Sequence, residues 1–520
     1  MILPALLAVL LVRIVLTYGV FNDTIDEQGH LRDGLDLLAT GRNEAEAQHP
    51  PLARIFLAAL PYYRGGLRRE GDTLWNGGPW TRRELPYYWY TLSLARAGNL
   101  VFAVLALVIA WLWAARLHGP RAGPVAGLLL VCCPNFLAHA GLATLDMAGA
   151  ATVFAAAYCF WRWSLEPSWR WSVVSAIAFA LAVLTKFSAL VFLPPLAVAY
   201  FLLARPQFRL APVALFAVLT TVLVWAGYGF DVGPIAPAGH RYLSAYPMGP
   251  ESTLARRVSR ILGTNTIPAP RLVQGLIDLA SHNQTGHPAY LLGRHSQTGW
   301  WYYFPVALAV KTTLPLLLLA ALALWRVARP KLLPPLLGAL AVLAVSMPGN
   351  INIGVRHILP VYLFCAVLAS GLVAAAPLAR LAKVATVALI GWHVIESLRA
   401  HPDYLPYFNQ IARGREERFL ADSNLDWGQD LARLAHYVRD HNITSIQVKC
   451  SGFVDLPKLG IPARPFTGDP GWVAISANYL VGLGPHQEAV EWAHARTPRA
   501  RIGRSIWIYY EPVIQSNRKP

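Results

Sequence analysis

The chain has 520 residues, of which 55% are hydrophobic and only 14% are charged. A soluble globular protein carries about 25% charged residues, and several apolar runs approach the roughly 20 residues that a helix needs to cross a bilayer. The composition therefore excludes an ordinary soluble protein. It predicts an α-helical polytopic membrane protein.

The formal net charge of +17 would suit a nucleic-acid-binding protein, but the placement of the charge argues against one. Eleven basic residues and one acid, Glu166, occupy five short connections between apolar runs, at 116–121, 162–170, 205–209, 326–331 and 380–383. Basic residues in short loops between spans mark the cytoplasmic side of a membrane. We therefore expect contact with membrane lipids, no nucleic acid, and five cytoplasmic loops.

Eleven membrane spans are predicted in chain order, at about residues 2–20, 97–116, 122–138, 147–163, 171–185, 188–204, 210–228, 303–325, 332–348, 356–376 and 382–398. The stretch 171–204 is counted as two spans because a single helix of that length would measure about 51 Å, against a hydrocarbon core of about 30 Å. A single span would also place the basic loops on opposite sides of the membrane. Lys186 is then expected at an outer turn.

This topology leaves four segments outside: loops at 22–96 and 229–302, a turn at 139–146, and a tail at 399–520. Surface helices are expected at 51–61 and 254–262, and an aromatic belt at 300–303. In the tail, short β-type runs alternate with helical patterns. We therefore divide the chain into a transmembrane domain, residues 1–398, and a small extracytoplasmic α/β domain, residues 399–520.

The same topology gathers polar residues at the outer ends of the spans. These are three carboxylates, two cations and three histidines: Asp26, Glu27 and Asp146; Lys186 and Arg356; His30, His49 and His357. Cations at this depth suit an anionic lipid phosphate as leaving group. A carboxylate beside them suits removal of the proton from an acceptor hydroxyl.

Each of these residues also has a structural explanation. The Asp26–Glu27 pair suits the start of a solvated loop, and Asp146 suits a helix N-cap. Interfacial lysines and arginines often extend to lipid headgroups. His30 and His49 are candidate metal ligands, although isolated histidines usually form ordinary hydrogen bonds. Arg13, inside the first span, needs a buried partner or water, and the sequence identifies neither.

Several segments resemble the dolichyl-phosphate-mannose protein mannosyltransferases and their bacterial relatives. Thr-Ile-Asp-Glu-Gln-Gly-His at 24–30, followed by His-Pro-Pro-Leu at 49–52, is similar to the first outer loop of that family. Gly-Trp-Trp-Tyr-Tyr-Phe-Pro at 299–305 with Lys311, Gly-Val-Arg-His-Ile-Leu-Pro at 354–360, and the run at 422–431 look like the bacterial group. The resemblance covers nearly the whole chain.

The resemblance implies a C-type glycosyltransferase fold and a polyprenyl-phosphate-linked sugar as donor. It implies that Asp26 is the general base with Glu27 beside it, that Asp146 is the second acidic position, and that Arg356, with Lys186 as a further candidate, binds the donor phosphate. The three histidines are expected to contact substrate. The resemblance also implies inversion; retention would need a carboxylate nucleophile, which Glu27 or Asp146 would supply.

Two features keep the cofactor and acceptor open. No cofactor is expected with certainty, and a divalent metal stays possible because some members of the wider superfamily use one. Eukaryotic members carry a β-trefoil between spans, whereas this chain has a different C-terminal tail. A protein acceptor is therefore not implied, and a lipid or glycan acceptor is equally compatible.

The predicted function is hexosyl or pentosyl transfer from a polyprenyl-phosphate donor to an extracytoplasmic acceptor. The enzyme is expected in the bacterial inner membrane, with its active site and tail on the extracytoplasmic face. The alternatives are a lipid-linked sugar transporter or flippase, and a polymerase or ligase that uses diphosphate-linked glycans. A transporter typically binds near the bilayer midplane, often within repeats, whereas the polar residues here lie at one interface.

Overall fold

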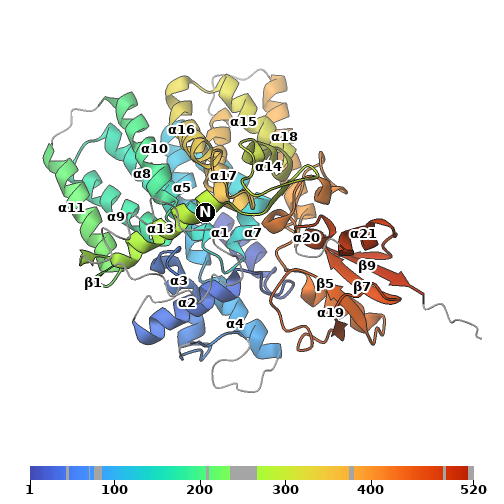
Figure 1. Ribbon diagram of the computed structural model, residues 1–520. Coiled ribbons are helices and arrows are strands. Elements are labelled where there is room, and N and C mark those ends of the chain that lie inside the picture. Colours follow the sequence, from blue (N-terminus) through green and yellow to red (C-terminus); the bar gives the residue numbers. More distant parts are fainter. Residues whose placement is uncertain are drawn as a thin grey trace, which may run out of the picture.

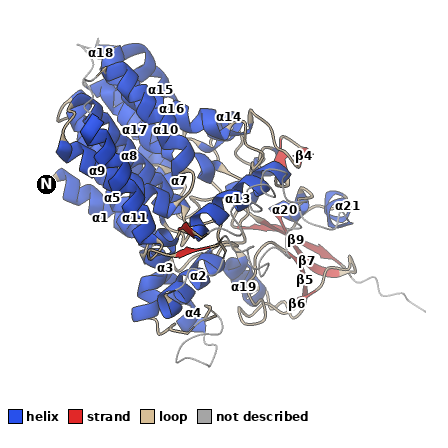
Figure 2. Ribbon diagram, turned by 60° about the vertical axis from the view of Figure 1, so that its left-hand side comes forward, coloured by secondary structure: helices blue, strands red, loops and turns tan. Residues whose placement is uncertain are grey.

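The computed structural model describes residues 1–41, 46–69, 71–74, 85–205, 210–234, 266–373, 380–483 and 488–512, a set that includes all the candidate site residues. The helices form a bundle, and a small β-sheet from the C-terminal part of the chain lies beside it (Figure 1). The turned view in Figure 2 shows the same separation between the helical bundle and this sheet.

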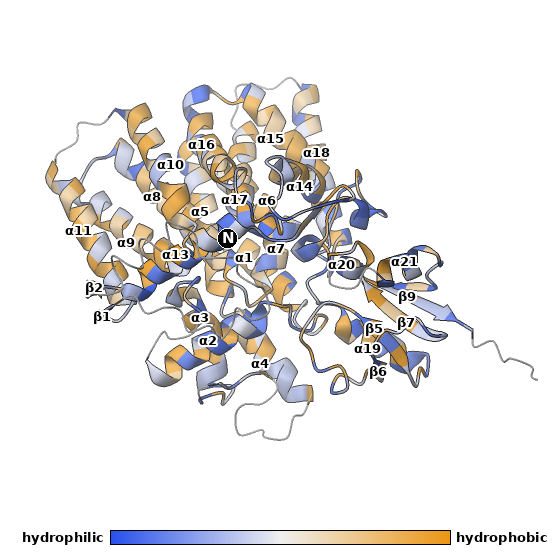
Figure 3. Cartoon of the chain, in the orientation of Figure 1, coloured by the Kyte–Doolittle hydropathy of each residue, from blue (hydrophilic) through white to orange (hydrophobic). Residues whose placement is uncertain are grey.

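The bundle helices lie at the positions of the predicted spans, and their apolar residues dominate the colouring of the bundle in Figure 3. They are α1 (Ile2–Val15), α5 (Leu100–His118), α6 (Ala122–Val131), α8 (Asp146–Leu165), α9 (Trp169–Thr185), α10 (Ala189–Ala204), α11 (Leu210–Gly227), α15 (Leu314–Arg326), α16 (Arg329–Ser346), α17 (Pro360–Ser370) and α18 (Arg380–Arg399). As expected, Lys186 separates two helices, α9 and α10.

By length and composition, four helices in the described part of the chain can each cross a membrane: Leu85–His118, Leu210–Gly227, Arg329–Ser346 and Arg380–Arg399. Two bent helix pairs raise this number to six, and several other apolar helices are shorter than 18 residues. The chain therefore has the features of a multi-pass membrane protein. The count of eleven spans stays a prediction.

Two predicted spans each consist of a bent pair of helices. The span at 122–138 consists of α6 and α7 (Pro134–Ala140), which meet at 66°, and the span at 303–325 consists of α14 (Tyr303–Lys311) and α15, which meet at 113°. Pro134 and Pro315 stand in the first turn of α7 and α15. A proline cannot donate the hydrogen bond that would continue the preceding helix, so each pair breaks at that point.

The two large loops, at 22–96 and 229–302, contain further short elements. The first holds α2 (Glu27–Thr40), α3 (Pro51–Tyr63) and α4 (Leu85–Ala97), and α4 continues into the line of α5. The second holds β1 (Val232–Gly233), β2 (Ile267–Pro268), α13 (Pro270–Thr285), β3 (Ala289–Leu291) and β4 (Arg294–Ser296). The helix expected at 254–262 lies outside the described residues.

The tail forms a five-stranded mixed sheet in the order β6-β5-β7-β9-β8. Its elements are α19 (Leu431–Asp440), β5 (Ile446–Lys449), β6 (Ala463–Arg464), β7 (Gly471–Ser476), α20 (Ala477–Leu480), α21 (Glu488–His494), β8 (Ala500–Ile502) and β9 (Ile506–Glu511). Successive residues of a strand point to opposite faces. Val473 and Ile475 join the large apolar core of the bundle, whereas Ala474 joins a smaller core with Leu434 and Ile446. The two faces of the sheet thus belong to different apolar cores.

Arg13 has buried partners that the sequence did not identify. Its guanidinium donates to the carbonyl oxygens of Val131 (2.9 Å) and Ser397 (2.8 Å), and to the hydroxyl of Tyr404 (3.1 Å). Val131 ends α6, and Ser397 lies in the last turn of α18. Carbonyl groups in the last turn of a helix lack intrahelical partners and attract cations. Arg13 therefore ties α1 to the ends of two other helices.

We predict that Arg13→Met destabilises the protein, because it leaves these buried carbonyls without a donor, at a cost of roughly 1–3 kcal/mol for each unsatisfied group. Thermal unfolding of the purified protein in detergent measures the effect. Arg121→Met, which changes an exposed arginine between α5 and α6, is the control. Equal melting temperatures for the two variants would contradict the structural role of Arg13.

Candidate functional site

The candidate residues come from separate elements that meet at one end of the bundle. Asp26 is the N-cap residue of α2, and Glu27 and His30 lie in the first turns of that helix. Asp146 begins α8, Lys186 follows α9, and Arg356 and His357 lie on the 3₁₀ helix η2 (Val355–Ile358). His49 lies just before α3.

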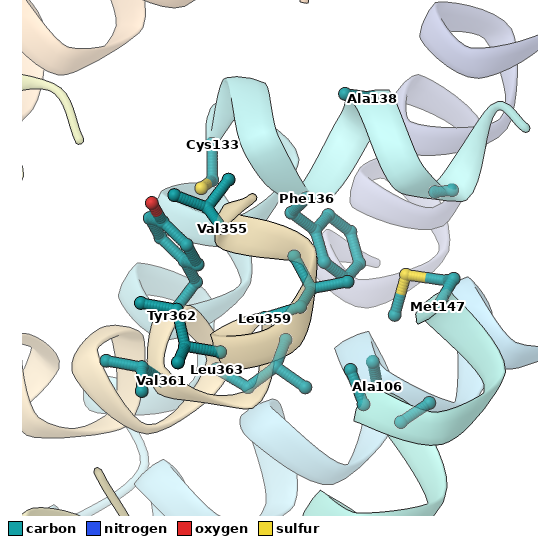
Figure 4. Close-up of a cluster of buried hydrophobic side chains, with 14 of the residues drawn as sticks. Ala106, Cys133, Phe136, Ala138, Met147, Val355, Leu359, Val361, Tyr362 and Leu363 are labelled. Carbon is teal, nitrogen blue, oxygen red and sulfur yellow. The ribbon is translucent and has the colours of Figure 1, made fainter. Parts of the chain in front are cut away.

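Buried apolar side chains next to the candidate residues in the chain help to position them. Figure 4 shows Val355 in a cluster of buried apolar side chains that also includes Phe136 of α7 and Met147 of α8. All three are at most 1% exposed and belong to one core cluster. Since Val355 precedes Arg356 and Met147 follows Asp146, close packing of this cluster holds η2 against the start of α8.

Asp26 and Arg356 form an ion pair, with 2.6 Å between Oδ2 and Nη1. The Asp26 side chain is 30% exposed and that of Arg356 12%. Although Asp26 occupies the N-cap position of α2, its side chain makes no capping hydrogen bond. The Asp26 carboxylate therefore binds the Arg356 guanidinium, and part of its surface remains accessible to solvent.

Asp146 and Lys186 form a second pair, with 2.6 Å between Oδ1 and Nζ. The Lys186 side chain lies against Gly149, where an added Cβ would be 2.9 Å from its Cβ and Cδ. The expectation that Asp146 caps α8 is wrong, because the N-cap residue is Leu145 and no side chain caps the helix. Lys186 pairs with a buried carboxylate and does not simply extend to headgroups.

Glu27 lies next to Asp26 but is 1% exposed and enclosed by donors. Its carboxylate accepts hydrogen bonds from Arg96 (2.8 and 2.9 Å) and from the N–H groups of Ala143 and Thr24 (both 2.7 Å). Burial opposes its ionisation, but Arg96 and these N–H groups hold the pKa of Glu27 below its ordinary value. Glu27 thus joins the first outer loop to α4 and to the turn before α8.

We predict that Glu27→Gln and Asp26→Asn differ sharply in stability. Removing one charge from a buried ion pair typically costs about 3–5 kcal/mol, so Glu27→Gln should strongly lower the melting temperature. Asp26→Asn should lower it much less because Asp26 is partly exposed. A well-folded Glu27→Gln protein that has lost only activity would assign Glu27 a chemical role instead.

Histidines surround the two ion pairs. The rings of His30 and His49 are 5.1 Å apart, and the His357 ring stacks on Phe304 at 6.5 Å. Burial, together with the neighbouring His49 and Arg54, lowers the pKa of His30 well below its ordinary value. A neutral imidazole both donates and accepts hydrogen bonds, as recognition of sugar hydroxyls requires.

A second histidine pair was not singled out from the sequence. Nε2 of His282 lies 3.2 Å from Nδ1 of His287, and burial and the neighbouring His282 lower the pKa of His287 to about 4. Within the described ranges, no group of three or more His, Cys, Asp or Glu side chains is arranged to hold a metal ion.

The run at 422–431 contributes residues to the site that the sequence analysis treated only as a subgroup motif. The Trp427 ring covers Arg356, with 4.3 Å from its centroid to Cζ. Asp422 has a φ of +55°, which is unusual for a residue other than glycine. Burial raises the pKa of Asp422 to about 6, although Arg356 opposes the shift. The sequence offered one signal for this part of the site: three aspartates, at 422, 426 and 430, are spaced four residues apart around Trp427.

Residues 91–227 match the model of the family described as dolichyl-phosphate-mannose-protein mannosyltransferase. This segment of the chain is similar to that family. The matched segment includes Asp146 and Lys186, whereas Asp26 and Arg356 lie outside it. No curated protein matches the sequence.

Solved structures agree with this relationship at the level of the fold. ArnT from Cupriavidus metallidurans bound to undecaprenyl phosphate is similar with a TM-score of 0.51, at 15% identity over 97% of both chains. Its apo state gives a TM-score of 0.50 with the same identity and coverage. An Archaeoglobus fulgidus oligosaccharyltransferase is more distant, with a TM-score of 0.41 at 12% identity over 92% of this chain and 70% of that one. The chain thus shares its overall fold with ArnT.

Proposed function

We propose that this protein transfers a sugar from a polyprenyl-phosphate donor to a hydroxyl group of an extracytoplasmic acceptor. The observation that carries the proposal is the Asp26–Arg356 pair, a partly exposed carboxylate bonded to a guanidinium at one end of the bundle. The pair combines a base for the acceptor with a cation for the donor. The second cation, Lys186, belongs to the same group of residues.

The donor phosphate is bound by Arg356. A guanidinium presents a planar set of N–H donors that matches phosphate oxygens, and a lysine reproduces this geometry poorly. Before the donor binds, Asp26 neutralises Arg356. The phosphate then competes for the guanidinium, which frees the Asp26 carboxylate to act as a base.

Transfer follows as a single displacement. The acceptor oxygen attacks the anomeric carbon and the bond from that carbon to the phosphate oxygen breaks. Asp26 takes the acceptor proton, and the electron pair leaves on the phosphate, where Arg356 and Lys186 stabilise the charge. One base and one leaving-group site suffice for this displacement, so we propose inversion at the anomeric carbon.

The other candidates take supporting roles in this scheme. Asp146 is bonded to Lys186 at 2.6 Å and is 4% exposed, so we assign it to holding that cation. Glu27 has its own set of donors and is assigned to positioning Asp26. The three histidines, His30, His49 and His357, are assigned to the sugar hydroxyls of the substrate.

The similarity to ArnT supports the lipid donor. The ArnT structure that covers 97% of this chain contains undecaprenyl phosphate. We infer the same class of carrier here, and propose an enzyme of a bacterial inner membrane. The sugar and the acceptor are not specified by the residues of the site.

A direct test is to incubate the purified protein in detergent with a panel of polyprenyl-phosphate sugars and analyse lipid, glycan and protein fractions by mass spectrometry. Transfer of a sugar without any membrane gradient supports the enzyme and argues against a transporter. Transfer only from diphosphate-linked glycans would replace the proposal with a polymerase or ligase.

We predict that Asp26→Asn reduces transfer by about 10²–10⁴-fold, the usual contribution of general-base catalysis. Donor binding should survive, because Arg356 and Lys186 are unchanged and Asp26 no longer competes with the phosphate. Transfer rates and donor affinity are measured on the same preparation.

Asp403→Asn is a matched control for this variant. Asp403 pairs with Arg433 at 2.6 Å and is 22% exposed, close to the values for Asp26, but it belongs to another ion pair. The control should retain transfer. Near-normal transfer by folded Asp26→Asn would refute the assignment of Asp26 as base.

We also propose that the site and the tail face the extracytoplasmic side. Two connections with basic residues, 116–121 and 326–331, meet at the end of α17, where Gly371 lies against His118 and Val327. Arg356 lies on η2, just before the start of α17, and Asp146 is the first residue of α8. The positive loops are expected in the cytoplasm.

We predict that a cysteine replacing Phe453, which is 71% exposed in the tail, reacts with a membrane-impermeant thiol reagent in right-side-out vesicles. A cysteine replacing the exposed Arg121 should react only after permeabilisation. Both variants are made with Cys450 changed to serine to remove a nearby thiol. The reverse labelling pattern would invert the proposed topology.

A further inference from the structure

Trp427, a residue of the tail, contacts Arg356 and the residue before Asp26. Its ring covers the Arg356 guanidinium at 4.3 Å. Its carbonyl oxygen accepts a hydrogen bond of 3.1 Å from the N–H of Ile25, the residue before Asp26. Trp427 thus contacts the Arg356 guanidinium and is hydrogen-bonded to the backbone next to Asp26.

The loop that carries Trp427 is itself fixed from the bundle side. Asn424 accepts a hydrogen bond from the N–H of Val355 (3.0 Å), which precedes Arg356. The carbonyl of Asn424 accepts a hydrogen bond of 2.6 Å from the buried Lys311 of α14. The loop is therefore fastened to η2 and to α14 at the same residue.

The tail fixes the same loop from the other side. Asn478, at the start of α20, donates from its backbone N–H to Asp426 (3.1 Å) and accepts from the N–H of Asp422 (2.8 Å). Ser451 also donates to Asp426 (3.0 Å). Trp427 is 2% exposed. Its ring is therefore held in place before any donor is present.

We propose that Trp427 is the positioning residue of the phosphate-binding cation, and that the tail serves the reaction by presenting it. An arginine side chain loses much conformational freedom when it is fixed, and a cation–π contact with a buried ring holds it without using its N–H donors. Arg356 is thus oriented with its hydrogen-bonding edge available for phosphate. The inference rests on the proposed function of Arg356 as the phosphate ligand.

The strength of the cation–π contact between Trp427 and Arg356 sets the expected change in affinity for undecaprenyl phosphate. A cation–π interaction of this kind corresponds to about a 2- to 30-fold change in an equilibrium constant. Trp427→Leu, which removes the aromatic face, should weaken binding of undecaprenyl phosphate by that factor. Trp427→Phe keeps an aromatic face and the backbone carbonyl and should restore most of the affinity.

Trp492→Leu is a matched control in the same part of the chain. The Trp492 ring covers Arg496 at 4.3 Å, the same distance as in the Trp427–Arg356 pair, but that arginine pairs with Glu511. Undecaprenyl phosphate affinity should be unchanged in this control. Melting temperatures measured on all variants separate a positioning effect from a general loss of folding.

Site-specific incorporation of a fluorinated tryptophan at position 427 provides a variant that keeps the shape of the side chain. Fluorine withdraws electrons from the ring face and weakens the cation–π contact without creating a cavity. Affinity for undecaprenyl phosphate should fall as fluorine atoms are added. This series serves as the test if Trp427→Leu does not fold.

The outcomes are distinct. Normal phosphate affinity in folded Trp427→Leu and in the fluorinated series would overturn the role of Trp427 while leaving the proposed function intact. Equal losses in Trp427→Leu and Trp427→Phe would also overturn it, because the aromatic face would then be irrelevant. Absence of undecaprenyl phosphate binding by the unchanged protein would overturn the proposed function and this inference together.

Discussion

The ion pair between Asp26 and Arg356 is the interaction on which the rest of the site depends. Its members are separated by 330 positions in the chain, yet their side chains meet at 2.6 Å. Desolvation opposes the formation of an ion pair that is only partly exposed. The surrounding structure must therefore hold the two side chains in place. The first outer loop, η2 and the loop at 422–431 each supply part of that support.

Other charged residues of the protein stabilise the structure, and their burial distinguishes them from the pair. Glu27 and Arg96 are both 1% exposed and satisfy each other. Lys311 is fully buried and donates to the carbonyls of Leu405 and Asn424. These buried ion pairs and hydrogen bonds cost desolvation energy. They also fix how the segments they join align with one another, which apolar contacts specify less strongly. The Asp26 side chain is 30% exposed, so it can be reached by a substrate and is suited to the proposed role of base.

The sequence predicted the helical segments well and their shapes less well. Long apolar runs bounded by basic loops located the bundle helices, and the charge pattern separated α9 from α10 at Lys186. The bends at Pro134 and Pro315 were missed because a proline near the middle of a long apolar run changes its hydropathy little. Within the site, Asp26 and Glu27 are adjacent and chemically alike, so only the placement of Arg96 and Arg356 in space distinguishes them.

The contribution of the tail was the least predictable part of the site. Trp427 reaches Arg356 because its loop is hydrogen-bonded to Val355, Lys311 and Asn478, and no local sequence pattern encodes contacts between residues so far apart in the chain. Arg356, which contacts Trp427, is proposed as the ligand of a lipid phosphate. Equilibrium binding of undecaprenyl phosphate to the unchanged protein, Arg356→Lys and Arg356→Ala tests that claim most directly. A severe loss in the alanine variant with partial retention in the lysine variant is predicted, and unchanged affinity in folded Arg356→Ala would contradict it.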